Sequence, residues 1–138
     1  MYFAYGANMD PVQMARRCPD ARRLGTAALA DHDFTIAAGG FGTAIPAAGR
    51  SVHGVLWSLT PADEQALDRF EEVDRGFYRK RSETVVTLDG KPVEAMIYHA
   101  VDASPGRPAA GYLERIVELA ESLSFPLEYL GHLRRLVA

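Results

Sequence analysis

The chain has 138 residues, of which 48% are hydrophobic and 24% are charged, and its formal net charge is −3 at pH 7. This length predicts a single domain, spanning residues 1–138, whose core is large enough to fold without disulfides or a structural metal. The acidic balance excludes the basic surface of a nucleic-acid-binding protein, and the lack of a run of about 18 apolar residues excludes a membrane-spanning helix, so we expect a small-molecule partner.

The N-terminal segment predicts a strand, a glycine loop and a helix. Residues 1–5 are apolar and aromatic, and Gly6 interrupts them as at the end of a buried strand. Asp10 followed by Pro11 has the chemistry of a helix start, so a short helix is expected to run to about Arg17. The segment lacks the charged and apolar regions of a secretory signal, which favours a cytoplasmic location.

Cysteine and histidine usage argues against a disulfide or a metal site. Cys18 is the single cysteine and is expected to be a half-buried packing residue. The four histidines are scattered and show no paired metal-ligand spacing; they are His32, His53, His99 and His132. The sequence therefore predicts no metal and no cofactor.

The middle of the chain predicts three strands and one long connection. Residues 24–29 and 34–38 are expected to form two short strands. Several glycines and a proline across 39–49 predict an irregular loop of the kind that often borders a site. Residues 52–59 then form a further strand.

A second helix is predicted after this strand. Thr60 followed by a proline has the chemistry of a helix start, and Leu67 and Phe70 are expected to point inward. The helix is expected to end near Glu71 and Glu72.

The C-terminal half predicts a hairpin followed by two helices. Residues 77–81 and 83–88 look extended, Asp89-Gly90 predicts a two-residue turn, and 93–99 is the partner strand. A helix follows, in which apolar residues recur at helical spacing up to Leu123, and a short closing helix begins after Pro126. Together these elements predict an α+β fold with a mixed, curved or barrel-like sheet and helices packed outside.

Two segments combine residue types that suit chemistry. Residues 5–8, Tyr-Gly-Ala-Asn, place a glycine after a strand, where backbone N–H groups could face a carboxylate or an oxyanion, although such a glycine is more often a simple turn. Residues 67–73, Leu-Asp-Arg-Phe-Glu-Glu-Val, place two acids where a helix meets a loop. A solvated helix end explains them equally, but acids oppose the helix dipole there, which slightly favours a functional role.

These segments resemble those of a known family. Tyr-Gly-Ala-Asn-Met at 5–9 resembles the Tyr-Gly-Ser-Asn-Leu signature of the γ-glutamylcyclotransferases, an AIG2-like family, and 67–73 with the later Gly76-Phe77-Tyr78 resembles their catalytic segment. The strand at 52–59 and the helix that begins with Pro-Leu-Glu-Tyr at 126–129 also match in order. The resemblance covers nearly the whole chain.

The resemblance implies a reaction and a set of site residues. It implies cyclisation of a γ-glutamyl amide to 5-oxoproline by the substrate's own α-amine, with Glu71 as the acid/base. The implied substrate-binding residues are Tyr5, Gly6, Ala7, Asn8, Met9, Tyr78, Tyr98 and Tyr112. Without the resemblance, packing explains each tyrosine better. Two positions depart from the family, because Ala7 replaces a common serine and Glu72 stands where the family commonly has glycine.

Burial raises the pKa of a carboxyl toward neutrality, so we expect Glu71 to lie in a pocket while Glu72 points to solvent. The alternatives are a non-catalytic protein of the same fold that binds a small carboxylate, and an interaction domain that docks a partner through helices at 109–123 and 127–136. The leaving group is left open and is expected to depend on the loops at 39–49 and 102–108. The choice between monomer and homodimer also stays open.

Overall fold

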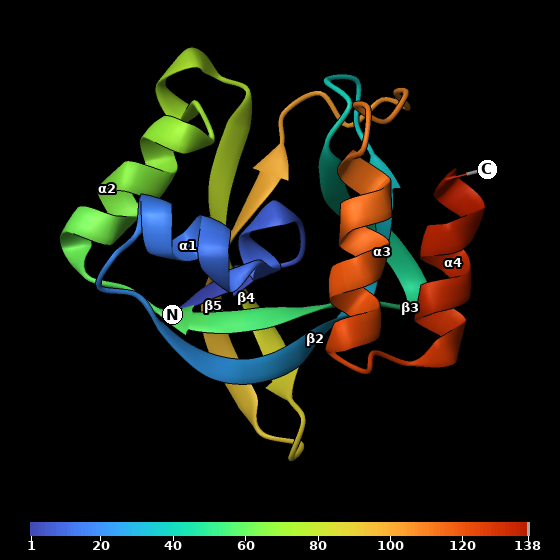
Figure 1. Ribbon diagram of the computed structural model, residues 1–138, viewed down its shortest axis with the longest axis horizontal. Coiled ribbons are helices and arrows are strands. Elements are labelled where there is room, and N and C mark those ends of the chain that lie inside the picture. The colour runs from blue at the N-terminus through green and yellow to red at the C-terminus, as the bar shows by residue number, and fades with distance from the viewer. Residues whose placement is uncertain (138) are drawn as a thin grey trace.

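In the computed structural model, which describes residues 1–137, five strands close into a barrel in the order β1-β3-β2-β4-β5 (Figure 1). The strands are β1 (Tyr2–Ala4), β2 (Arg22–Ile36), β3 (Gly42–Ser58), β4 (Tyr78–Thr87) and β5 (Pro92–Ala100). Neighbouring strands are antiparallel except β1 and β5, whose parallel pairing at Tyr2 and Met96 closes the barrel. The predicted α+β class with a barrel-like sheet is confirmed.

Strands β2 and β3 form one long hairpin, which corrects two predictions. The two short strands expected at 24–29 and 34–38 belong to one strand, and only residues 39–41 of the irregular loop expected at 39–49 lie outside a strand, because β3 begins at Gly42. The pairing is interrupted rather than ended: the register shifts beside Gly25, and residues 47–50 of β3 have no ladder partner opposite Asp31, which has a left-handed φ of 57°. A bulge bends a strand without ending its hydrogen bonding, so polar and glycine residues here do not mark a loop.

The β4–β5 hairpin is confirmed, with two differences in detail. Strand β4 is continuous where two extended pieces were expected. The turn contains three residues rather than two, because the Thr87 N–H donates to the Lys91 carbonyl at 2.9 Å and the Gly90 N–H donates to the Thr87 carbonyl at 2.9 Å. Gly90 has a φ of 85°, which is the left-handed position that a three-residue hairpin loop requires.

The four α-helices are α1 (Pro11–Arg17), α2 (Pro61–Phe70), α3 (Tyr112–Ser122) and α4 (Leu127–Val137), with 3-10 turns η1 (Ala7–Met9) and η2 (Val73–Arg75). Of the four, α1 and α2 begin where their capping chemistry predicts, while α3 begins at Tyr112, three residues later than expected. The Asp10 carboxylate accepts from the Val12 N–H at 2.9 Å, and the Thr60 hydroxyl accepts from the Asp63 N–H at 3.1 Å. Each cap satisfies a donor that has no partner within its helix.

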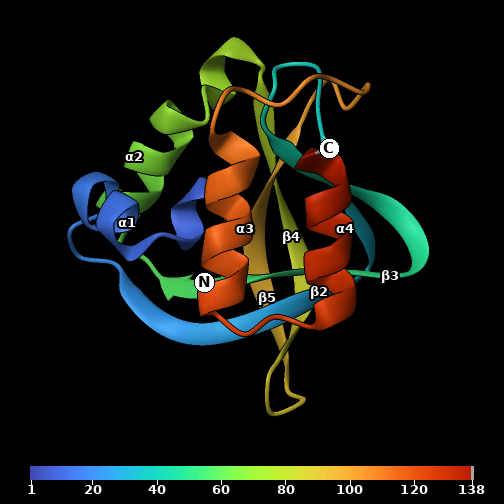
Figure 2. The same ribbon diagram turned by 45° about the vertical axis from the view of Figure 1, so that its right-hand side comes forward.

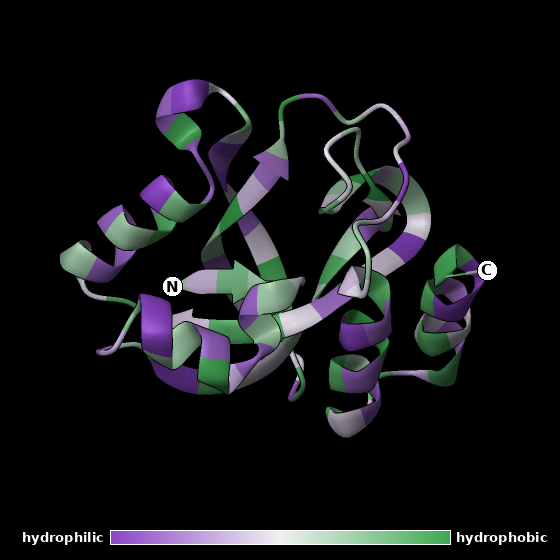
Figure 3. Ribbon diagram, turned by 45° about the horizontal axis from the view of Figure 1, so that its top comes forward, coloured by the Kyte–Doolittle hydropathy of each residue, from purple (hydrophilic) through white to green (hydrophobic). Residues whose placement is uncertain are grey.

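The helices cover the barrel in two pairs. In Figures 1 and 2, α1 and α2 lie on one side and α3 and α4 lie side by side on another. Figure 3 shows hydrophilic and hydrophobic residues interleaved along α3 and α4, and the buried ones include Ile116 and Leu133. Packing against the barrel thus accounts for the apolar spacing that the interaction-domain alternative invoked.

The burial predicted for three side chains can be compared with the structure. Leu67 is fully buried, as expected. Phe70, expected inward, is instead 40% exposed, because it lies in the last turn of α2, beyond the core. Cys18, expected half-buried, is only 1% exposed, and its thiol donates to the Asp63 carbonyl at 3.5 Å. None of the helices in residues 1–137 is both long and apolar enough to cross a membrane.

Candidate active site

A cavity of about 510 Å³ lies at one end of the barrel. Its walls come from the loop after β1, the β2–β3 turn, the segment from α2 to β4, the end of β5 and the first residue of α3. Figure 1 shows the loops of these segments at the end opposite the β4–β5 turn. The lining residues used below are Tyr2, Tyr5, Gly6, Ala7, Asn8, Phe41, Gly42, Phe70, Glu71, Glu72, Phe77, Tyr78, Tyr98, Val101, Asp102 and Tyr112.

Glu71 provides an ionisable carboxyl group in this cavity. It is the residue on which α2 ends, and its backbone N–H donates to the Leu67 carbonyl at 2.8 Å. Burial raises the pKa of its side chain to about 7, while the Arg17 guanidinium acts in the opposite direction. No group within residues 1–137 donates a hydrogen bond to this carboxyl. It is therefore free to bond to a ligand.

Glu72 differs from its neighbour because the backbone turns at this residue. Its φ of 53° and ψ of 45° are left-handed, the conformation that glycine favours at a helix end. Its carbonyl accepts from the Arg75 N–H at 3.1 Å, and its side chain, 44% exposed, pairs with the Arg75 guanidinium at 2.8 Å. Glu71 lies in a pocket as predicted, but Glu72, expected to point to solvent, lines the same cavity and is only partly exposed.

The loop after β1 is fixed by buried hydrogen bonds. The Asn8 side chain donates to the Tyr2 hydroxyl at 3.1 Å and accepts from the Arg17 guanidinium, and the Asn8 carbonyl accepts from the Trp57 indole at 3.1 Å. Asn8 therefore holds the cavity wall in place as well as lining it. Ala7 also lines the wall, and the N–H groups of Ala7 and Asn8 begin a 3-10 turn, where they have no carbonyl of that turn to donate to.

Met9 is the predicted site residue that the structure does not bring to the cavity. Its side chain is 2% exposed and belongs to the hydrophobic core. Its backbone N–H donates a hydrogen bond to the Gly6 carbonyl at 3.0 Å. Its place in the motif marks the end of the loop, where the chain re-enters the core. A ligand contact through Met9 does not fit this position.

Gly6 is required by a close approach rather than by a special backbone angle. A Cβ on Gly6 would lie 2.8 Å from the Tyr112 hydroxyl, and a Cβ on Gly42 would lie equally close to it. The same hydroxyl accepts from the Gly42 N–H at 3.0 Å. The two glycines thus leave space for the Tyr112 hydroxyl in the cavity wall. This role of Gly6 differs from the expected one, in which a glycine exposes backbone N–H groups to a ligand.

All four predicted tyrosines line the cavity. Tyr5 donates to the Tyr98 carbonyl at 2.5 Å, Tyr78 donates to the Gly42 carbonyl at 3.1 Å, and Tyr98 donates to an Asp68 carboxylate oxygen at 2.6 Å. Burial raises the pKa of each phenol, and for Tyr112 the value is about 12. The tyrosines are therefore neutral hydrogen-bonding groups at physiological pH.

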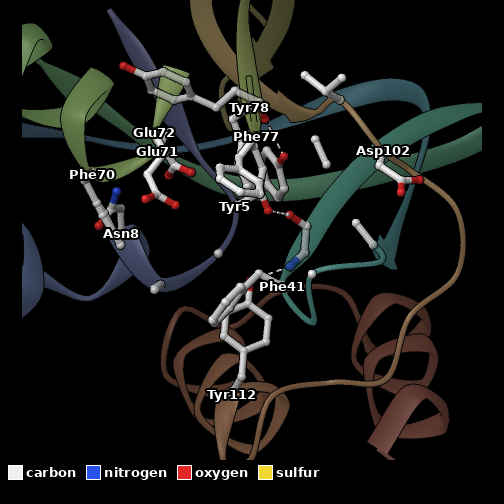
Figure 4. Close-up of a pocket in the computed structure, with 18 of the residues that line it drawn as sticks. Tyr5, Asn8, Phe41, Phe70, Glu71, Glu72, Phe77, Tyr78, Asp102 and Tyr112 are labelled. Carbon is white, nitrogen blue, oxygen red and sulfur yellow. Dashed lines mark hydrogen bonds between the residues drawn. The ribbon is translucent and has the colours of Figure 1, made fainter. Parts of the chain in front are cut away.

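Sequence reasoning named neither Tyr2 nor Phe77 as a site residue, and it reached Phe41 and Asp102 only as members of the loops at 39–49 and 102–108, which were expected to influence the leaving group. Figure 4 shows Phe41, Phe77 and Asp102 around one cavity with Glu71, Tyr5, Tyr78 and Tyr112. A signal for Phe41 existed, because it is a single aromatic residue among glycines at 39, 40 and 42. Nothing in the local sequence connects it to Glu71, since the two lie on separate elements.

The arrangement suits proton transfer without a metal. Across the described chain, His, Cys, Asp and Glu side chains form no group of three that could hold a metal ion. A carboxyl with a pKa near 7 can both accept and deliver a proton at neutral pH. The aromatic walls and N–H groups around it suit a small, folded ligand with polar ends.

Three comparisons bear on this site. A profile of the AIG2-like family matches residues 51–133, more than half of the chain. The curated gamma-glutamylcyclotransferase of Bos taurus is 29% identical over 139 residues, covering 94% of this chain and 74% of the bovine one. The Homo sapiens protein of the same name is 29% identical over 144 residues, covering 97% and 77%.

A solved structure named gamma-glutamyl cyclotransferase has the same fold. It superposes with a TM-score of 0.88 at 26% sequence identity, covering 96% of this chain and 85% of the other. The similarity therefore includes the barrel and the helices around it.

Proposed function

The chain belongs to the AIG2-like family, and from this premise we propose that it is a γ-glutamylcyclotransferase that releases 5-oxoproline from γ-glutamyl amides. The names of its bovine and human relatives support this activity. The observation that carries the proposal is the Glu71 carboxyl, which lies in the cavity with a pKa near 7 and with no hydrogen-bond donor among residues 1–137.

In the proposed reaction the substrate supplies its own nucleophile. Glu71 takes a proton from the substrate's α-ammonium group, and the amine nitrogen then attacks the γ-carbonyl carbon and closes a five-membered lactam. Glu71 delivers this proton to the amide nitrogen, whose bond to that carbon breaks. The second proton lost by the attacking nitrogen passes through Glu71 to the departing amine, which leaves as an ammonium. The products are 5-oxoproline and a free amine, so no water is consumed. Such proton transfers contribute roughly 10²- to 10⁴-fold to a rate.

The rest of the cavity would position the substrate. A γ-glutamyl chain must fold back on itself for its amine to reach its γ-carbonyl, and holding that geometry supplies about 7–11 kcal/mol. The N–H groups at Ala7 and Asn8 would bind the substrate carboxylate or the developing oxyanion, the latter worth roughly 3–4 kcal/mol per donor. The tyrosine side chains would form walls that exclude water from the reacting atoms.

Mass-spectrometric detection of 5-oxoproline from a panel of γ-glutamyl amides, including glutathione, tests the proposal. We expect release by the wild type and loss of release in a folded Glu71→Gln variant. Glu128→Gln serves as the matched control, because Glu128 is exposed on α4 and does not line the cavity. No release from any amide would favour a protein of the same fold that only binds a small carboxylate, an alternative that the Ala7 and Glu72 departures suggest.

A small-molecule γ-glutamyl substrate and a cytoplasmic location are part of the same proposal. The location rests on the lone cysteine, which needs no oxidising compartment to fold.

A further inference from the structure

The six phenylalanines of this protein divide into three buried and three that are 40% exposed or more. Of the six, Phe3, Phe34 and Phe125 are at most 6% exposed. The other three are Phe41, Phe70 and Phe77, at 49%, 40% and 52% exposed, and all three line the cavity. Val101, at 52%, lines it as well. Large apolar side chains gathered at one place on a surface usually mark a binding site.

These four side chains, which we call the apolar rim, come from four separate segments. Phe41 lies in the β2–β3 turn, Phe70 ends α2, Phe77 precedes β4 and Val101 follows β5. Figure 4 shows the three phenylalanines approaching the cavity from different segments. Phe41 packs edge-on against Tyr112, with ring centroids 5.2 Å apart. Because side chains that are both exposed and lining a cavity lie at its opening, the apolar rim surrounds the mouth.

The charges at the mouth are unfavourable for an anion. The charged side chains that line the cavity are Glu71, Glu72 and Asp102; within the described residues no Lys, Arg or His joins them. Two arginines lie nearby, but both are engaged. The Arg17 guanidinium sits 3.5 Å above the Phe70 ring and bonds to Asn8, and the Arg75 guanidinium pairs with Glu72 and lies 5.2 Å from the Phe77 ring.

Building on the proposed function, we propose that the amine expelled from the substrate is an apolar amine without a carboxylate, whose hydrocarbon part is held by the apolar rim. The glutamyl group must lie against Glu71, so the remainder of the amide projects toward the mouth. A hydrocarbon group there would cover Phe41, Phe77 and Val101 and gain from their burial. A carboxylate there would face Asp102 with no cation among the lining residues to pair with, and uncompensated charge at an interface is costly.

Four substrates separate these two effects. γ-Glutamylethylamide and γ-glutamylalanine differ only by a carboxylate, and γ-glutamylphenethylamide and γ-glutamylphenylalanine differ in the same way, while the second pair adds a phenyl ring to the first. All four yield 5-oxoproline, so one product assay gives kcat/KM for each. We expect the phenethylamide to be the best substrate, exceeding both the ethylamide and γ-glutamylphenylalanine by roughly tenfold or more.

The Phe77→Ala variant tests the role of the apolar rim. Phe77 is half exposed, so its loss should spare the fold, and the ratio of kcat/KM for phenethylamide to that for ethylamide should fall roughly tenfold. Leu88→Ala is the matched control, because Leu88 is 90% exposed in the hairpin turn at the opposite end of the barrel, and it should leave the ratio unchanged.

Two kinds of result would overturn the inference while sparing the proposed function. One is 5-oxoproline release with equal or better kcat/KM for the carboxylate-bearing or ethyl substrates. The other is a ratio that Phe77→Ala does not change, or that Leu88→Ala lowers as much. Failure of all four substrates to yield 5-oxoproline would instead refute the proposed function, and this inference with it.

Discussion

Replacing Glu71 with glutamine should make the protein more stable and inactive at the same time. The substitution keeps the shape of the side chain and removes its charge. In the folded chain burial raises the pKa of Glu71 from its ordinary value of 4.5 to about 7. The folded state therefore holds the proton more tightly than the unfolded state does, and ionising the group costs folding free energy.

The sign and size of the effect follow from these two pKa values. Below pH 4.5 the group is protonated in both states and the wild type bears no penalty. As pH rises toward 7 the unfolded chain ionises first, so the wild type loses stability, and above 7 the loss is complete at roughly 3 kcal/mol. A glutamine does not ionise. The difference in unfolding free energy between Glu71→Gln and the wild type should thus grow, in favour of the variant, by about 2–3 kcal/mol between pH 5 and pH 8.

Urea unfolding at the two pH values, followed by the fluorescence of Trp57, measures this difference. Trp57 is the single tryptophan and is buried, so unfolding changes its surroundings. The control variant Glu128→Gln, on the exposed face of α4, should have the same unfolding free energy as the wild type at both pH values. A Glu71→Gln advantage that stays constant with pH would refute the claim that the cavity desolvates this carboxyl. Retained turnover in the same variant would remove Glu71 from the proposed mechanism.

Three further predictions concern the same chain. Because Glu71 must be ionised to accept a proton, kcat/KM should rise with pH through an apparent pKa near 7. A flat profile of kcat/KM between pH 5.5 and about 8 would count against Glu71 as the base. Gly54→Ala would place a Cβ 2.3 Å from the Ala4 carbonyl oxygen, so the urea midpoint should fall by the equivalent of about 1–3 kcal/mol or more; an unchanged midpoint would contradict the close packing of β1 on β3. Glu72 has a left-handed φ of 53°, which glycine adopts more easily, so Glu72→Gly should stabilise the fold by roughly 0.5–1 kcal/mol despite losing the ion pair with Arg75. A lower melting temperature would show that the lost ion pair outweighs the gain in backbone conformational energy.

Sequence reasoning failed where the tertiary surroundings of a residue, rather than its local sequence, decided its position. The strand breaks expected near Asp31 and across 42–49 rested on residues that disfavour regular strands, but long paired strands tolerate such residues as local shifts of register. The inward position expected for Phe70 followed helical spacing correctly, yet at the last turn of α2 the barrel no longer provides a core. Met9 fell inside a matched motif, but its side chain belongs to the hydrophobic core and does not line the cavity.

Local chemistry in the sequence determined much of the secondary structure. The caps at Asp10 and Thr60, the turn at Gly90 and the apolar spacing of α3 and α4 all depend on residues within a few positions of one another, so their pattern is readable without a fold. The family resemblance added Glu71 and four tyrosines as site residues, and these five side chains line the same cavity.

Tertiary structure decided what the cavity is. The pairing of β1 with β5 closes the barrel through residues far apart in the chain, and closure brings the apolar rim, Tyr112 and Glu71 to one end. The left-handed turn at Glu72 gives two adjacent acids different surroundings, one buried with a pKa near 7 and the other paired with Arg75. Burial and long-range proximity set these properties, and neither is encoded in local sequence.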